Sequence, residues 1–133
     1  MYDVYAKSFR TKQIKVNYNS NLELDINFLI KSIDKDISMI MMANPNSPTG
    51  TIIEEKFIKE ILIKAQKNNC YVVIDEAYFG FYKKNYVNLI NKFRNLIIIR
   101  TFSKAAGMAG LRAGYLISNQ INIKRMYTFR PMY

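Results

Sequence analysis

The sequence contains no histidine and no tryptophan, and Cys70 is its single cysteine. Without histidine the chain has no imidazole for acid–base catalysis or metal binding, and one cysteine cannot form an internal disulfide. No carboxylate cluster has the spacing of a metal site, and no signal peptide or apolar run long enough to span a membrane is present. These absences predict a cytoplasmic protein with no metal site and no membrane segment.

Acidic residues are also scarce, because 10 Asp and Glu stand against 20 Lys and Arg and leave a formal net charge of +10. A basic excess of this size is typical of nucleic-acid-binding proteins when the cations cluster. Here they are spread along the chain, and the nearest approach to a patch is Lys56, Lys59, Lys64 and Lys67 in one predicted helix. The distribution therefore argues against nucleic acid as a partner.

Short apolar runs alternate with amphipathic segments along the 133 residues, a length that suits one domain with a core. Strands are predicted at 13–18, 37–43, 70–75, 96–101 and 113–118, and helices at 2–10, 25–33, 54–68, 86–93 and 121–128. Strands alternating with helices predict an α/β fold, a three-layer α/β/α arrangement with a mainly parallel sheet. The direction of the strand 113–118 stays open, because a tight glycine-containing loop precedes it.

Polar residues follow three of the predicted strands. They are Asn44-Pro45-Asn46-Ser47-Pro48-Thr49-Gly50, then Asp75-Glu76-Ala77-Tyr78, then Ser103-Lys104 with Arg112 eight residues on. Ligands of open α/β sheets bind at the carboxyl ends of the strands, so the three segments predict one site. A lysine among hydroxyls and small residues, with a second cation nearby, suits a phosphate and an amine that forms a Schiff base.

Each segment has an ordinary structural interpretation when taken alone. The Pro and Gly residues form turns in many proteins, and Asp75 could simply cap a helix. Tyr78 could be half-buried packing, and Arg112 a surface cation. Glu76 is interpreted as structural, because successive side chains of a strand alternate between its faces.

Four segments, in order and in spacing, resemble the fold-type I pyridoxal-phosphate aminotransferases of class I/II, with the histidinol-phosphate aminotransferase branch nearest in wording. They are Asn46-Ser47-Pro48-Thr49-Gly50, Asp75-Glu76-Ala77-Tyr78, Ser103-Lys104 and Gly110-Leu111-Arg112-Ala113-Gly114-Tyr115. The resemblance covers nearly the whole chain.

The resemblance implies a pyridoxal 5'-phosphate site with Lys104 as its catalytic residue. Lys104 would hold the cofactor as a Schiff base and move the proton between substrate and cofactor. Asp75 would face the pyridine nitrogen and keep it protonated, which makes the ring an electron sink. Tyr78 would hydrogen-bond the cofactor's O3′.

The resemblance also implies the remaining cofactor contacts. Ser103 and Arg112 would bind the phosphate, and Tyr2 would stack on the pyridine ring. Many relatives carry asparagine directly before Pro-Thr-Gly, where this chain has Ser47 and places Asn46 one step earlier. Either Asn46 reaches O3′, or Ser47 makes a shorter contact, or a water fills the gap.

Members of this family are much longer than this chain and carry an N-terminal glycine-rich loop and a C-terminal small domain. Residues 1–133 are therefore expected to be part of the large, cofactor-binding domain, a fragment of a parent that forms a homodimer. The parent reaction would transfer an amino group between an amino acid, or a phosphorylated amino alcohol such as histidinol phosphate, and a 2-oxo acid. The alternatives are a non-catalytic remnant and a pyridoxal-phosphate-dependent lyase or decarboxylase of the same fold.

Overall fold

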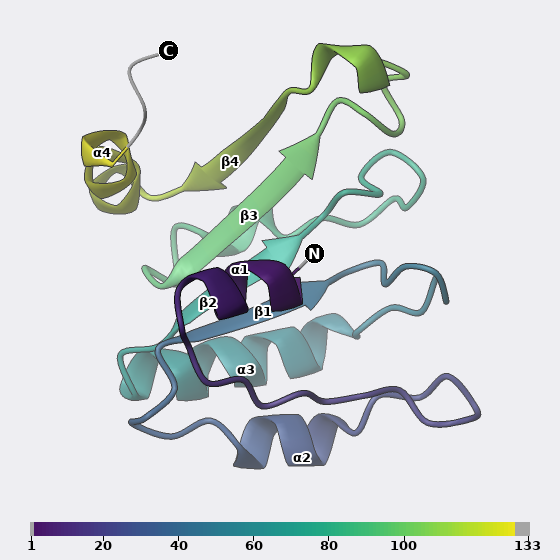
Figure 1. The fold of residues 1–133 in the computed structure, drawn as a ribbon. Helices are drawn as coiled ribbons and strands as arrows, with labels where there is room; N and C mark the ends of the chain where they lie inside the picture. Colours follow the sequence, from purple (N-terminus) through teal and green to yellow (C-terminus); the bar gives the residue numbers. More distant parts are fainter. Residues whose placement is uncertain (1, 130–133) are drawn as a thin grey trace.

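The computed structural model describes residues 2–129 and shows one sheet with helices on both faces (Figure 1). The helices are α1 (Tyr2–Ser8), α2 (Ile26–Lys31), α3 (Glu55–Lys67) and α4 (Gln120–Thr128), with 3₁₀ turns at Val87–Leu89 and Ala109–Leu111. The strands are β1 (Met39–Ala43), β2 (Tyr71–Asp75), β3 (Leu96–Thr101) and β4 (Gly114–Ser118). The predicted α/β class is confirmed.

The strands lie in the order β1-β2-β3-β4. The first two pairings are parallel and the third, between β3 and β4, is antiparallel, so the sheet is mixed and mainly parallel. Gly114 begins β4 directly against β3, where an added Cβ would lie 2.6 Å from the carbonyl oxygen of Arg100. The connection 102–113 contains no crossover helix of the kind that parallel neighbours need, and this gives β4 its reversed direction.

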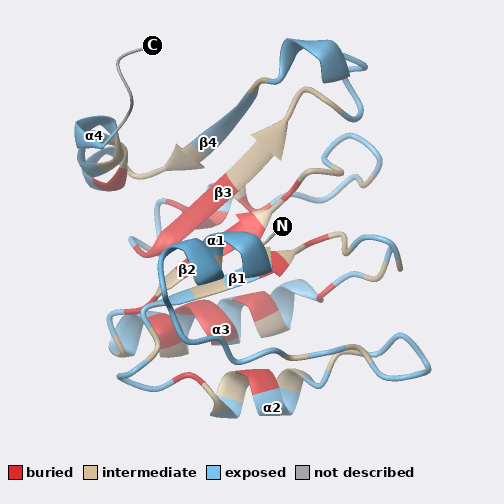
Figure 2. Ribbon diagram, in the orientation of Figure 1, coloured by how far each residue is buried: buried red, intermediate tan, exposed pale blue. Residues whose placement is uncertain are grey.

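One face of the sheet packs against α2 and α3 and is called here the closed face. Alternate residues of the central strands point to it, including Val72, Ile74, Leu96 and Ile98, and each of these is fully buried. From α3 they meet the predicted apolar stripe, of which Ile58, Ile61, Leu62 and Ala65 are buried. Figure 2 shows the buried residues concentrated in α3, β2 and β3.

The other face carries α1 and α4 and is called here the open face. Both helices are largely exposed, and α1 contains no buried residue (Figure 2). Met39, Tyr71 and Ile97 point to this side and line a hollow together with Met126 and Phe129 from the C-terminal helix segment. Helices therefore lie on both faces, as predicted, although their coverage is unequal.

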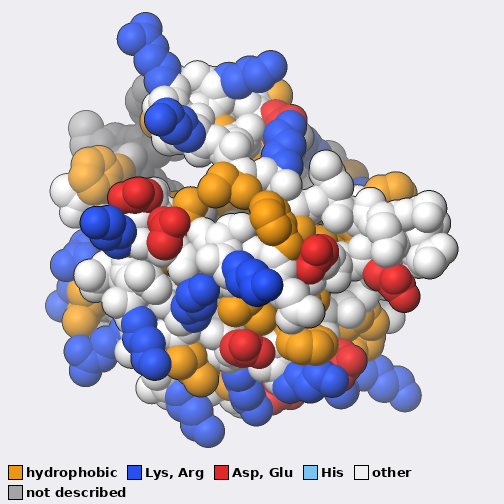
Figure 3. Space-filling view, turned by 90° about the horizontal axis from the view of Figure 1, so that it is seen from below, with side chains coloured by type: hydrophobic (Ala, Val, Ile, Leu, Met, Phe, Trp, Pro, Cys, Tyr) orange, Lys and Arg blue, Asp and Glu red, His pale blue; other side chains and the backbone are white. Residues whose placement is uncertain are grey.

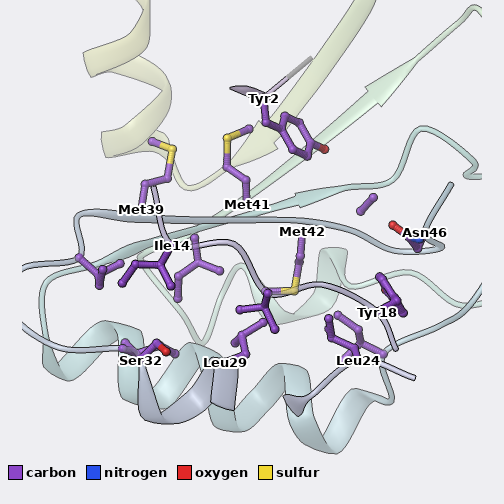
Figure 4. A pocket seen from close by; sticks show the side chains of 16 residues that line it. Tyr2, Ile14, Tyr18, Leu24, Leu29, Ser32, Met39, Met41, Met42 and Asn46 are labelled. Carbon is purple, nitrogen blue, oxygen red and sulfur yellow. The ribbon is translucent and has the colours of Figure 1, made fainter. Parts of the chain in front are cut away.

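Two secondary-structure predictions are wrong. Residues 13–18 form no strand and make only one isolated bridge, between Tyr18 and Leu24. Ile14, Val16 and Tyr18 still line one pocket of about 260 Å³ beside β1 (Figure 4). The alternation is therefore real, although no strand among residues 2–129 pairs with this segment in a ladder. The predicted helix 86–93 is instead a single 3₁₀ turn, Val87–Leu89, followed by further turns. Leu89 and Ile90 are buried there without a regular helix.

The surface charges over α2 and α3 are mixed rather than segregated. Figure 3, seen from the side of α2 and α3, shows Lys and Arg side chains distributed among Asp and Glu. Within residues 2–129, no helix is both long enough and apolar enough to cross a membrane.

Candidate cofactor site

The first loop of the candidate site is fixed by a buried asparagine at the end of β1. Asn44 donates from Nδ2 to the hydroxyl of Tyr86 at 2.9 Å, and its Oδ1 accepts from the backbone N–H of Ile53 at 2.9 Å. Tyr86 is itself buried, and its pKa is raised to about 12, chiefly by burial. The sequence did not indicate that Asn44 and Tyr86 hold this loop, because their contact joins residues 42 positions apart.

Within this loop the two neighbouring candidates point to different partners. The hydroxyl of Ser47 lies 3.1 Å from the phenol of Tyr78. The amide of Asn46 instead donates to Thr49 at 2.8 Å, within its own loop. The geometry therefore puts Ser47, and not the side chain of Asn46, in contact with the loop that follows β2.

Asp75 ends β2 and is held by two donors. Its Oδ1 accepts from the backbone N–H of Ala77 at 2.9 Å, and its Oδ2 accepts from the hydroxyl of Tyr2 at 2.6 Å. Partial burial and this carboxylate raise the pKa of Tyr2. The N-terminal helix thus brings Tyr2 to Asp75, 73 positions away in sequence, with the phenol directed at the carboxylate.

Glu76 points to the closed face, as expected for the residue after Asp75 in an extended strand. Its Oε2 lies 2.7 Å from Nη2 of Arg100, and its Oε1 accepts from the backbone N–H of Tyr86. The side chains of this ion pair are 3% and 8% exposed, so Glu76 is part of the packed interior.

Lys104 extends from the loop after β3 toward Tyr78. Its Nζ lies 5.5 Å from the centre of the Tyr78 ring. The hydrogen bond from Ser47, and next the positive charge of Lys104, lower the pKa of the Tyr78 phenol. The two loops also touch at Gly80, where an added Cβ would lie 2.8 Å from Cβ of Ala105. The structure therefore gathers Ser47, Tyr78 and Lys104 from three strand ends.

The predicted phosphate ligands are less closely tied to this cluster. The backbone N–H of Ser103 donates to the hydroxyl of Thr101 at 3.0 Å. Arg112 adopts a left-handed backbone with φ of 51°, and its Nη1 donates to the carbonyl of Ala109 at 3.1 Å. Arg112 is exposed, and within residues 2–129 no hydrogen bond or ion pair joins it to Ser103 or Lys104.

The chemistry of the donor set fits pyridoxal phosphate. The carboxylate of Asp75, to which the Tyr2 hydroxyl donates in this structure, suits a protonated ring nitrogen. The phenol and hydroxyl suit a ring oxygen, and the primary amine suits an aldehyde. Ser103 and Arg112 add donors suited to a phosphate. Gly107, three residues after the lysine, has φ of +69° and open space where a Cβ would stand. In the part of the chain that the structure describes, no group of three or more His, Cys, Asp or Glu gathers as in a metal site.

The sequence matches the family described as Aminotransferase class I and II over residues 1–133. The chain belongs to that family. The predicted resemblance is confirmed at this level, and it extends to the histidinol-phosphate branch. A histidinol-phosphate aminotransferase of Thermoanaerobacter pseudethanolicus is 42% identical over the whole chain, which spans 37% of that relative's length.

Two solved structures share the fold of the chain. The histidinol-phosphate aminotransferase of Clostridium acetobutylicum superposes with a TM-score of 0.83 at 29% identity, covering 92% of this chain and 37% of that one. The histidinol-phosphate aminotransferase of Sinorhizobium meliloti, solved in complex with pyridoxal-5'-phosphate, has a TM-score of 0.82 at 24% identity. The match covers 97% of this chain and 36% of that one. The fold of the chain is thus that of one part of a longer aminotransferase.

Proposed function

We propose that residues 1–133 form part of the large, cofactor-binding domain of a pyridoxal-phosphate-dependent aminotransferase. The observation that carries the proposal is the approach of Lys104 to Tyr78, with Ser47 on the same phenol, in a chain 42% identical to a histidinol-phosphate aminotransferase. The proposed substrates are an amino acid or a phosphorylated amino alcohol such as histidinol phosphate, and a 2-oxo acid.

The proposal gives each residue of the candidate site a role in cofactor binding or proton transfer. Lys104 would hold the cofactor through its side-chain amine and would carry a proton to and from the substrate Cα. Asp75 would keep a proton on the ring nitrogen, and Tyr78 with Ser47 would contact the ring oxygen. Ser103 and Arg112 would bind the phosphate. When bound, pyridoxal phosphate would supply the electron sink that stabilises a substrate carbanion.

Tyr2 and Asn46 keep more limited roles. Tyr2 is proposed to lie on the ring, although in the structure its hydroxyl donates to Asp75, the residue proposed to face the ring nitrogen. Asn46 is proposed to shape the loop through Thr49, leaving the cofactor contact to Ser47.

The assembly and the location are also proposals. Large apolar side chains near the site are exposed, among them Phe81, Met108 and Leu111, which supports an interface such as that of a homodimer. A cytoplasmic location is supported by the single cysteine, and the scattered cations favour small-molecule partners over nucleic acid.

A cofactor-binding experiment tests the proposal. We expect the purified chain mixed with pyridoxal phosphate to gain a visible absorption band, and borohydride reduction to fix the cofactor on Lys104, as located by peptide mass spectrometry. Lys104→Ala should lose both signals, whereas Lys92→Ala, a lysine remote from the site, should keep them. Attachment spread evenly over surface lysines would contradict the assignment.

A further inference from the structure

A buried polar network joins the strand ends that carry the candidate cofactor site. β1, β2 and β3 are parallel, so their carboxyl ends lie at one side of the sheet (Figure 1). Asn44 directly follows β1, Glu76 directly follows β2, and Tyr86 lies in the segment between β2 and β3. All three side chains are buried, and none of them is among the residues assigned to the cofactor. Their polar groups bond to the protein itself.

Tyr86 connects two of these strand ends through its two polar groups. Its backbone N–H donates to Oε1 of Glu76 at 3.1 Å, and Glu76 in turn pairs with Arg100 of β3. Its hydroxyl accepts from Nδ2 of Asn44 at 2.9 Å and donates to the carbonyl of Ile53 at 3.3 Å. The hydroxyl thus uses its donor and an acceptor position in a buried environment, where such hydrogen bonds are strong and a lost partner is costly.

Asn44 and Ile53 form the base of the loop that carries Ser47. The base is closed by Oδ1 of Asn44, which accepts from the backbone N–H of Ile53 at 2.9 Å. Above the base the loop is bonded to itself, because the backbone N–H of Asn46 donates to the carbonyl of Thr51 at 2.9 Å. A loop braced in this way moves largely as a unit, so a hydroxyl that holds its base also sets the position of its tip.

Ser47 is the point at which this loop meets the candidate site, since its hydroxyl lies 3.1 Å from the hydroxyl of Tyr78. This hydrogen bond is the first cause of the lowered pKa of Tyr78, and the positive charge of Lys104 is the second. The charge of Asp75 acts in the opposite direction. The pKa of the Tyr78 phenol therefore reports whether Ser47 is in place.

We propose that Tyr86 is a positioning residue of the candidate cofactor site, whose hydroxyl holds the loop 44–53 so that Ser47 reaches Tyr78. The hydroxyl acts through the two residues at the base of the loop and does not touch the cofactor. The inference rests on the proposed function for the purpose of the contact, which is to present the Tyr78 phenol to the ring oxygen. The contact itself can be measured without any cofactor.

Tyr86→Phe tests the proposal, because it removes the hydroxyl and keeps the buried ring. The Tyr78 phenol is titrated by NMR in the cofactor-free chain labelled with ¹³Cζ-tyrosine, and its signal is assigned by its loss in Tyr78→Phe. Sucrose in every sample favours the folded state. We expect Tyr86→Phe to raise the pKa of Tyr78 by at least about half as much as Ser47→Ala does. The double variant should raise it no further than Ser47→Ala alone, since both changes act on one contact.

Tyr71→Phe is the matched control. It removes a partly buried hydroxyl that contacts Arg125 at the start of β2, at the opposite end of the sheet, and should leave the pKa of Tyr78 unchanged. The titration follows the signal of the folded chain, so a change in overall stability does not move it. A Tyr78 pKa that stays at its unmodified value in Tyr86→Phe or in Ser47→Ala, or that rises equally in Tyr71→Phe, would overturn the proposal.

Cofactor affinity gives the second measurement. Tyr86→Phe should weaken binding of pyridoxal phosphate about threefold or more, because Ser47 and Tyr78 no longer meet the ring oxygen together. Tyr71→Phe should bind the cofactor as the unmodified chain does. An unchanged affinity in Tyr86→Phe would also overturn the positioning role. An unmodified chain that binds no cofactor contradicts the proposed function instead, and the phenol titration then decides the positioning role by itself.

Discussion

The closed and open faces of the sheet differ in how completely helices cover them. On the closed face, α3 buries the side chains of Ile58, Ile61 and Leu62 completely against the strands. On the open face, another hollow, of about 610 Å³, lies between α4 and residues of β3 and β4. Met39, in the hollow described above, remains 50% exposed. Parallel strands are normally buried on both faces. In this chain helices cover the closed face completely and the open face only in part.

The two faces also differ in their roles, because the closed face forms the core and the other side carries Asp75 of the candidate site. Closed-face residues make the core, and the ion pair of Glu76 and Arg100 lies at the carboxyl end of that face. Asp75, one residue before Glu76, points to the other side and meets Tyr2. Adjacent carboxylates of one strand therefore serve different purposes because the pleat directs them to opposite faces.

The largest expected effect comes from breaking the buried ion pair. Glu76→Ala would leave the almost fully buried side chain of Arg100 without a carboxylate partner and remove the acceptor of the Tyr86 N–H. We expect a loss of about 3–5 kcal/mol in the free energy of unfolding, measured by urea denaturation. Glu55→Gln, which breaks the exposed pair with Lys59, is the control and should change stability little. Equal effects of the two variants would mean that the pair is solvated in solution.

The next effect compares two neighbouring isoleucines of β3. Ile98 is fully buried on the closed face, whereas Ile99 points to the hollow of the open face. Ile98→Ala should cost about 3 kcal/mol of unfolding free energy, and Ile99→Ala about 1 kcal/mol, because the second site is already partly solvated. Urea denaturation of both variants checks the difference. Similar costs would show that the open face is covered in solution, for example by association of chains, which sedimentation would detect.

The closed face was the more predictable of the two from the sequence. The apolar stripe of α3 and the runs that became β2 and β3 depend on local periodicity, which a single sequence contains. The segment 13–18 shows the limit of that signal. Its alternation describes an extended backbone correctly, but the formation of a ladder depends on a neighbouring strand that periodicity does not reveal.

For the candidate site, the sequence indicated which residues come together better than it indicated which contacts they make. The polar residues at the strand ends predicted one site, and the structure brings Ser47, Tyr78 and Lys104 from these ends together. The family match confirms the resemblance. The choice between Asn46 and Ser47 was open, because it depends on how the loop turns after Asn44. The anchoring of Asn44 by Tyr86 joins distant segments, and no local pattern indicates it. The cofactor roles themselves stay predictions.

The smallest expected effect is a pH dependence that belongs to the closed face. Burial raises the pKa of the Cys70 thiol from 9.0 to about 11, so between these values the unfolded chain releases a proton that the folded chain retains. The contribution is fully present below pH 9 and is lost as the pH rises toward 11, with about 1 kcal/mol lost by about pH 10. Cys70→Ala lacks the thiol, so its urea midpoint should decline less over this range than that of the unmodified chain. Parallel declines in the two proteins would show that Cys70 reaches solvent and that the closed face opens near β2.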